Sequence, residues 1–182
     1  MNCKKSICNL LIVSALSVLS PTFAQNWKPI SSAITFKIKH FGAVADGSFK
    51  DFSGTIFFDA TNISATIIKA NIDTKSINTG IGLRDNALRG NDYFDVEKYP
   101  KISMVSTKIE KNVGQNSYTG FFMLTIKGIT KNIKIPFTFT QDGAKAVFRG
   151  NFEISRTEFG VGGKSLIIGN SVNISILVNT QQ

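Results

Sequence analysis

The chain of 182 residues contains only two cysteines, and both lie at its start. Cys3 and Cys8 belong to a segment that we predict to be removed on export, so residues 25–182 carry no thiol. This scarcity excludes a disulfide framework and a cysteine nucleophile from the predicted mature chain. A domain of this length can be stable without disulfides, because its core can be large enough.

Histidine is scarcer still, because His40 is the only one in the chain. A zinc site built from histidines is therefore excluded within one chain, and no loop has the acidic spacing of a calcium site. A serine nucleophile would have to use His40 as its base, and the sequence has no GxSxG motif. We expect no metal and no enzymatic activity, and a lipid-modifying enzyme that uses His40 is the remaining catalytic alternative.

No apolar run is long enough to cross a membrane as a helix, which takes about 20 residues. The longest is Leu10 to Leu19, which follows two lysines and precedes the small residue Ala24. A charged start, a short apolar stretch and a small residue, in that order, are typical of a secretory signal peptide. We therefore predict that residues 1–24 are cleaved and that residues 25–182 form one periplasmic or secreted domain.

Period-two alternation of apolar and polar residues, in contrast, is abundant. Ile34, Phe36 and Ile38 alternate with polar residues, and the same pattern recurs over 133–139 and 172–178. It is typical of antiparallel strands with one apolar and one solvated face. The pattern predicts eight strands, at residues 32–40, 48–58, 63–73, 101–110, 117–127, 131–140, 145–155 and 171–180.

Eight such strands can close into a barrel, which removes exposed strand edges. We therefore predict an all-β fold, an eight-stranded antiparallel β-barrel with a short helix near residues 81–90. A barrel of this size is either filled by side chains or hollow enough for one small ligand. The chain has 15 phenylalanines, many of them at inward positions, and they are compatible with both alternatives.

Two polar residues fall at the ends of predicted strands. His40 has the parity of the inward Phe36 and Ile38, so we expect it in the interior or at the rim. It is either a hydrogen-bonded structural histidine or a group that binds the polar head of a ligand. Arg156 follows the seventh strand, and it either forms a salt bridge, for example to segment 84–95, or binds a headgroup.

Short segments occur in a particular order along nearly all of residues 25–182. They are SAITFKIKHFG at 32–42, GSFKDFSG at 47–54, SINT at 76–79, RD at 84–85, DYFD at 92–95, YPKI at 99–102, LTIKGITK at 124–131 and RTEFG at 156–160. In order and spacing they resemble the YceI-like family of secreted lipid-binding proteins. That family often has His, Ser and Phe in place of Ala87, Gly90 and Tyr93, and a basic residue in place of Asp46.

The resemblance implies a hollow, lipocalin-like barrel that carries a polyisoprenoid, an isoprenoid quinone or a similar amphiphile. We therefore expect binding and transport or storage of one long-chain lipid, with no cofactor besides this ligand. The tail is expected among the inward residues Phe36, Ile38, Phe49, Ile68, Met104, Phe122, Leu124, Phe148, Phe152 and Ile174. The polar head is expected at a rim formed by His40, Arg84, Asp85, Arg89, Phe94 and Arg156.

Acidic residues are outnumbered, with 12 Asp and Glu against 21 Lys and Arg, and loss of Lys4 and Lys5 lowers the net charge from +9 to +7. The basic residues are scattered and form no dense run, so we expect no nucleic-acid partner. A basic surface can still touch anionic lipids, and transient membrane contact and a homodimer are further expectations. The alternative function is a filled barrel that uses this surface to bind an anionic partner.

Overall fold

A computed structural model of the chain describes residues 25–182, so the predicted signal peptide lies outside the described residues. The strands are β1 (Gln25–His40), β2 (Ala43–Phe49), β3 (Phe52–Phe58), β4 (Ile67–Asp73), β5 (Lys101–Lys111), β6 (Ser117–Ile126), β7 (Ile129–Asp142), β8 (Lys145–Ser155) and β9 (Ile168–Gln181). One helix, α1 (Gly82–Arg89), lies in the connection between β4 and β5. Short 3-10 helices occupy Ile63–Ala65, Thr74–Ser76 and Arg156–Phe159.

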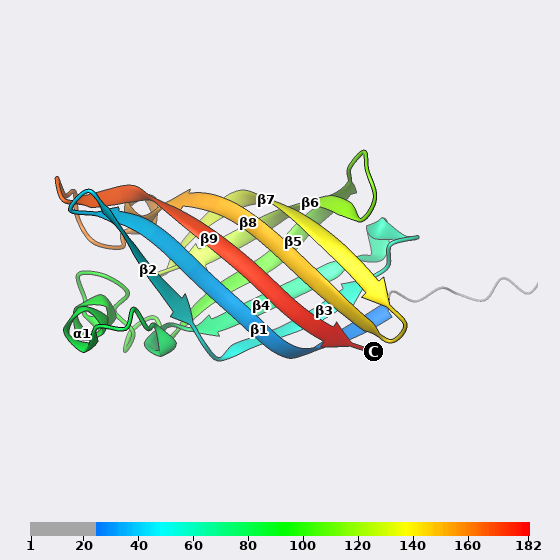
Figure 1. Ribbon diagram of the computed structural model, residues 1–182, viewed down its shortest axis with the longest axis horizontal. Coiled ribbons are helices and arrows are strands. Elements are labelled where there is room, and N and C mark those ends of the chain that lie inside the picture. Colours follow the sequence, from blue (N-terminus) through cyan, green and yellow to red (C-terminus); the bar gives the residue numbers. More distant parts are fainter. Residues whose placement is uncertain (1–24) are drawn as a thin grey trace, which may run out of the picture.

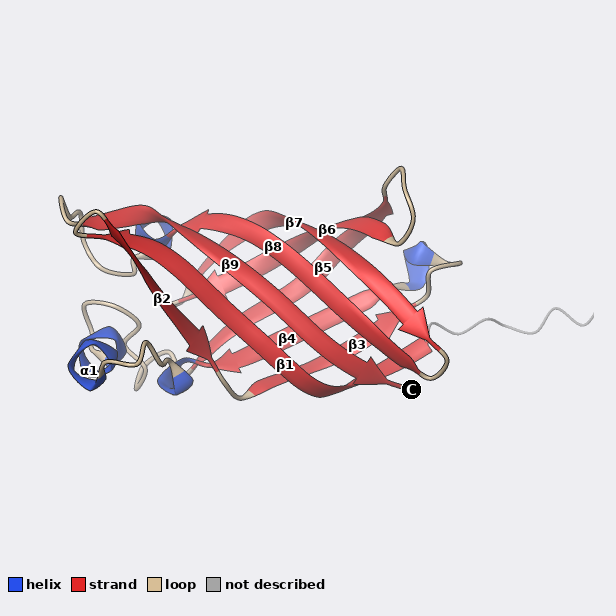
Figure 2. Ribbon diagram, in the orientation of Figure 1, coloured by secondary structure: helices blue, strands red, loops and turns tan. Residues whose placement is uncertain are grey.

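The sheet closes on itself because β1 pairs with β9 on one side and with β3 on the other. Eight strands, β1 and β3 to β9, form this antiparallel ring, and β2 is attached to it through β1. The structure thus confirms the predicted all-β barrel and its one short helix. The strands run obliquely along the long axis of the molecule, and the helical segments lie at its ends (Figure 1, Figure 2).

The predicted strand 48–58 is wrong in one respect, because the structure divides it into β2 and β3. Lys50 and Asp51 leave the strand between them, and Asp51 adopts a left-handed φ of 56°. The Ser76 hydroxyl accepts a hydrogen bond from the Lys50 amide (3.0 Å) and donates one to the Lys50 carbonyl (2.9 Å), which replaces strand partners there. The break explains why Phe49 and Phe52, which are three residues apart, both pack against the core clusters.

Other strand boundaries differ for local reasons. β4 begins at Ile67 instead of residue 63, because Asp59 starts a turn by accepting hydrogen bonds from the amide (2.8 Å) and hydroxyl (2.6 Å) of Thr61. A 3-10 helix follows that turn. β1 begins at Gln25 instead of residue 32, because its pairing with β9 continues through a register shift at Pro29 that interrupts the alternation.

The end of the barrel that holds the start of β1 is filled by aromatic side chains. Trp27 is fully buried, and its indole nitrogen donates a 3.1 Å hydrogen bond to the carbonyl of Phe58. The Phe58 ring lies 5.1 Å from that of Tyr118 and 4.5 Å from that of Phe139. We call this group, completed by Phe137 and Phe148, the aromatic plug.

At the opposite end the wall is closed partly by a loop. β7 pairs with β8 only as far as Phe137, and Pro136, which lacks an amide hydrogen, is its first residue without a partner on β8. The loop after β8 lies against the interior here, with Phe159 almost wholly buried against Leu124 and Ile126. Lys127 holds the loop by donating a 3.0 Å hydrogen bond to the Gly160 carbonyl.

Candidate functional site

The half of the barrel nearer to α1 is hollow. It contains a cavity of about 320 Å³ that reaches from the aromatic plug to the end of the barrel where α1 lies. Its wall is almost entirely apolar, as in binding sites for small apolar molecules. The structure therefore combines both possibilities that the sequence left open, since aromatic side chains fill one end of the barrel and the other end encloses the cavity.

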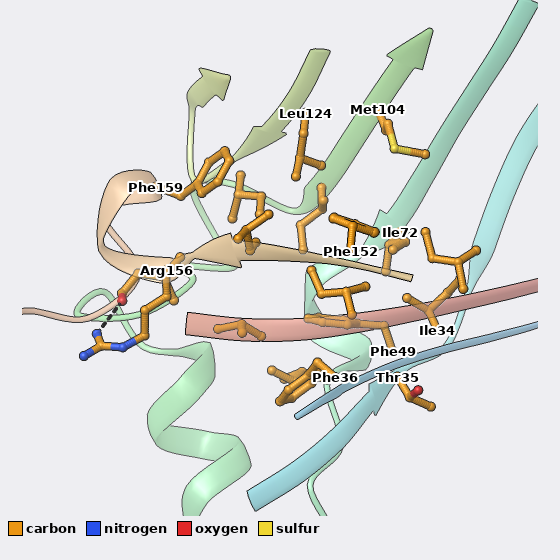
Figure 3. A pocket seen from close by; sticks show the side chains of 18 of the residues that line it. Ile34, Thr35, Phe36, Phe49, Ile72, Met104, Leu124, Phe152, Arg156 and Phe159 are labelled. Atoms are coloured by element: carbon orange, nitrogen blue, oxygen red, sulfur yellow. Dashed lines mark hydrogen bonds between the residues drawn. The ribbon is translucent and has the colours of Figure 1, made fainter. Parts of the chain in front are cut away.

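All ten residues expected to contact a lipid tail line this cavity, and they come from strands all round the barrel. Figure 3 shows Phe36, Phe49, Met104, Leu124 and Phe152 among the side chains that surround the space. Gly47 stands opposite Phe36 on β2, and a methyl group there would overlap the Phe36 ring. The Phe36 ring therefore lies over the backbone of β2 at Gly47. Any larger residue at position 47 would displace this ring.

The mouth of the cavity lies where β1, α1 and the loop before β9 meet. His40 lines it at the end of β1, opposite Ala43 on β2 and Ile168 on β9. The imidazole is partly exposed and packs edge-on against Phe41, with 4.7 Å between ring centroids. Among residues 25–182 its ring nitrogens have no hydrogen-bond partner, which leaves them available to a ligand.

Thr79, which was not predicted as a site residue from the sequence, organises the neighbouring part of the rim. Its hydroxyl donates to Asp85 Oδ1 (2.5 Å) and accepts from Arg84 Nε (2.8 Å). Asp85 Oδ1 also accepts from the Thr79 amide (2.8 Å), and Arg84 Nη2 donates to the Thr79 carbonyl (2.8 Å). These four bonds fix the first turn of α1 at the mouth, and they leave Nη1 of Arg84 without a partner among the described residues.

Four of the expected rim residues, His40, Arg84, Phe94 and Arg156, line the cavity. Asp85 and Arg89 are not part of its wall. Arg89 instead donates to the carbonyls of Lys75 and Ile77, both at 2.9 Å, and so holds α1 against the preceding segment. We conclude that Asp85 and Arg89 position the rim.

Arg156 lines the cavity but uses all its donors within the protein. The residue is only 5% exposed, and its guanidinium donates to the carbonyls of Val161 (2.9 Å) and Gly163 (3.0 Å). It also donates to the carbonyls of Ile168 (3.2 Å) and Gly169 (2.8 Å) and to Asn170 Oδ1 (3.4 Å). An arginine has five N–H donors, so none remains for a headgroup.

The expected salt bridge of Arg156 to segment 84–95 does not occur, since its partners all belong to residues 161–170. In Figure 3 the guanidinium points away from the apolar side chains of the cavity. Gly162 makes this arrangement possible, because it has a left-handed φ of 67° and a Cβ there would lie 2.8 Å from Arg156 Nη1. Arg156 thus shapes the loop that closes the wall, which is a structural role.

The hydrogen bonds to Asp85 predict a pH effect on stability. The Thr79 hydroxyl lowers the pKa of the Asp85 carboxyl below its ordinary value, burial opposes this, and the Thr79 amide, Arg89 and Arg84 reinforce it. A lowered folded-state pKa stabilises the protein above the unfolded pKa of about 3.9, and the contribution disappears as the pH falls through the folded value. We expect Asp85→Asn to destabilise the protein at pH 6 and the deficit to shrink towards pH 2.5.

Urea unfolding of both proteins across this pH range measures the effect. Asp142→Asn is the control, because Asp142 is an exposed carboxylate in the β7–β8 hairpin at the other end of the barrel. A deficit of Asp85→Asn that is the same at every pH would contradict the assignment, since it would show that the loss is one of packing alone.

Other residues of the cavity wall were not predicted from the sequence. Leu88 and Ala87 line it from α1, and Tyr93 and Phe159 line it from the loops that follow α1 and β8. Their inward orientation depends on loop conformation, which alternation along strands does not reveal. Among residues 25–182, no three His, Cys, Asp or Glu side chains gather in a way that could hold a metal ion, and no helix is both long and apolar enough to span a membrane.

The model of the YceI-like domain matches residues 26–180, nearly all that the structure describes. The chain belongs to the YceI-like family. A UPF0312 protein of Pseudomonas savastanoi pv. phaseolicola is 32% identical to it over 171 residues, which cover 88% of each chain. The family inferred from the order of the sequence segments is thereby confirmed.

Solved structures share the barrel of this YceI-like domain. BcnA of Burkholderia cenocepacia is similar with a TM-score of 0.78 and 30% identity, over 81% of this chain and 95% of BcnA. A domain from Saccharophagus degradans, described as polyisoprenoid binding and implicated in plant cell wall breakdown, has a TM-score of 0.67 and covers 88% of this chain and 99% of that domain. Its identity is 14%, so this likeness concerns the fold alone.

Proposed function

We propose that the chain binds one long-chain apolar lipid, a polyisoprenoid or a similar amphiphile, and transports or stores it. The observation that supports this most directly is the shape of the cavity, an apolar space closed at one end by the aromatic plug and reaching the rim at the other. An amphiphile fits such a space with its tail inside and its head at the rim. The polyisoprenoid binding described for the domain of Saccharophagus degradans agrees with this class of ligand.

The energetic reason is burial of the tail. Water inside an apolar cavity finds few hydrogen-bond partners, so the space favours hydrocarbon. Each buried CH₂ group stabilises the complex by about 0.8 kcal/mol, and the ordering of tail and protein offsets part of this gain. A protein that removes such a tail from water can move or keep a lipid that would otherwise be insoluble.

For the polar head we propose His40, Arg84 and Phe94, which line the cavity near the mouth. The imidazole can donate or accept a hydrogen bond, and Nη1 of Arg84 can donate to a carbonyl or phosphate oxygen. Arg156 is left out of this group because its donors are all used within the protein.

We propose binding without chemistry, in the periplasm or outside the cell. General acid–base catalysis by His40 would need a group that orients the imidazole, and its ring has no hydrogen-bond partner among the described residues. The predicted signal peptide supports export. A lipid-modifying enzyme would convert added lipid and lose this activity in His40→Ala, whereas a carrier returns the lipid unchanged in both forms.

The test is native mass spectrometry of the exported protein, together with mass spectrometry of its organic extract. We expect one long-chain amphiphile per chain, or uptake of one when polyprenyl lipid is added to the empty protein. A protein that is isolated empty and takes up no polyprenyl lipid, isoprenoid quinone or fatty amide would overturn the proposal. The alternative function, in which the barrel binds an anionic partner through its basic surface, would then be favoured.

A further inference from the structure

Exposed apolar side chains surround the mouth of the cavity on three protruding segments, which we call the mouth tips. They are the tip of the β1–β2 hairpin (residues 39–45) with Phe41 and Val44, the segment that enters α1 (residues 79–84) with Ile81 and Leu83, and the loop before β9 (residues 160–167) with Leu166 and Ile167. Figure 1 shows these segments at the same end of the molecule. The amide of Phe41 donates a 2.8 Å hydrogen bond to the carbonyl of Ile167, so two of the tips are joined.

These apolar side chains are far more exposed to solvent than those of the core. Phe41 is 70% and Leu83 86% exposed, and Leu166 has no cover at all. Single exposed apolar residues are ordinary, but a group that rims a cavity is typical of an interaction surface. At the opposite end of the barrel, Val113 in the β5–β6 turn is fully exposed, but no other exposed apolar side chain lies in that turn.

Each mouth tip also carries a basic residue, namely Lys39, Arg84 and Lys164. Segments 39–45, 79–84 and 160–170 contain no acidic residue. The acids that follow directly, Asp46 and Asp85, are set back from the tips: Asp46 lies across from Lys37 on β1, and Asp85 is buried and bonded to Thr79. The mouth tips thus combine apolar side chains with positive charge, which suits the interface of an anionic bilayer.

We propose that the protein docks by its mouth tips on the surface of an anionic membrane and exchanges its cargo there. Phe41, Leu83 and Leu166 enter the boundary between headgroups and acyl chains, while Lys39 and Lys164 contact lipid phosphates. The cavity then meets the bilayer directly, and the tail passes between them without crossing water. This step rests on the proposed function, because it explains how an apolar cargo is loaded and released.

Flotation with lipid vesicles tests the docking. The exported protein is mixed with vesicles of phosphatidylcholine, either alone or with a minority of phosphatidylglycerol. We expect it to float with the anionic vesicles at low salt and to be released as the salt concentration rises. Failure to float with anionic vesicles at low salt would overturn the proposal and leave the mouth tips to a protein partner.

Matched variants separate the two contributions to docking. Phe41→Ser/Leu83→Ser/Leu166→Ser should weaken partitioning onto anionic vesicles at least about tenfold, because the apolar contact is lost. Val113→Ser removes an equally exposed apolar side chain from the other end and should have no effect. Lys39→Gln/Lys164→Gln should weaken partitioning roughly 30-fold on anionic vesicles and leave the weaker binding to phosphatidylcholine unchanged. An unchanged affinity of the triple variant would overturn the assignment of the surface.

Cargo occupancy distinguishes a failure of docking from a failure of the proposed function. The triple variant should bind a short-chain polyprenyl lipid added in solution as the unsubstituted protein does, yet extract long-chain lipid from vesicles at least about tenfold more slowly. If the protein contains lipid but does not bind vesicles, the carrier function stands and the proposed docking surface is wrong. If the protein binds vesicles but never contains lipid, the carrier function itself is wrong.

Discussion

Ala70→Trp is expected to abolish lipid binding while the barrel stays folded. Ala70 lies in β4 with its side chain on the cavity wall, between Gly54 of β3 and Met104 of β5. An indole at this position projects into the cavity and displaces the equivalent of roughly five CH₂ groups of the tail. At about 0.8 kcal/mol for each CH₂, binding weakens by about 4 kcal/mol, or roughly a thousandfold. Native mass spectrometry with added polyprenyl lipid measures this loss.

The stability of this variant is informative, because overpacking a filled core costs about 1–3 kcal/mol. The cavity leaves room for the indole, so the free energy of unfolding in urea should change by less than about 1 kcal/mol. Val105→Trp is the control, since Val105 neighbours Met104 on the outer face of β5 and is not part of the cavity wall. Ala70→Trp with undiminished lipid binding would show that the cavity is not the binding site.

Trp27→Ala is expected to have the largest effect on stability. The side chain is wholly buried in the aromatic plug, with its ring 5.4 Å from that of Phe139, and its indole nitrogen bonds the carbonyl of Phe58. Removal of a buried aromatic side chain costs about 3–5 kcal/mol. The cost should lie at the upper end, because β1 pairs with β3 through only three residue pairs here, Gln25 to Trp27.

Far-UV circular dichroism during urea unfolding is the suitable measurement, since Trp27 is the only tryptophan and the variant has none. Trp27→Phe keeps most of the apolar volume but loses the hydrogen bond, and it should cost about 1–2 kcal/mol. Equal stability of Trp27→Ala and the unsubstituted protein would mean that the aromatic plug does not hold the ring of strands closed at this end.

The face of each strand could be predicted from the sequence because the alternation of side chains is a local property of an extended chain. Phe36, Leu124 and Ile174 were placed inward on this ground, and all of them line the cavity. The same reasoning failed at the start of β1, where a register shift at Pro29 interrupts the alternation and separated Trp27 from the predicted strand. Without Trp27 the aromatic plug was invisible, and the sequence alone did not show which half is hollow.

Arg156 shows a second limit. Its position after a predicted strand was correct, but its partners are five acceptors between Val161 and Asn170. Those carbonyls converge because Gly160 and Gly162 adopt left-handed backbone angles, so the contacts depend on loop conformation and not on residue type. A buried arginine among carbonyls and an arginine that binds a headgroup therefore look the same in the sequence.

Under the proposed carrier function, the aromatic plug limits the length of the lipid tail that the cavity can hold. Because the cavity ends at the rings of Phe58 and Phe139, the proposed lipid would enter tail first, leave by the same opening and keep its head outward. Each added carbon strengthens the complex only until the tail reaches the blind end, and further carbons stay in water at the mouth. The depth of that end, set by a few aromatic rings, would thus select the length of the proposed lipid, whereas the rim would select its head.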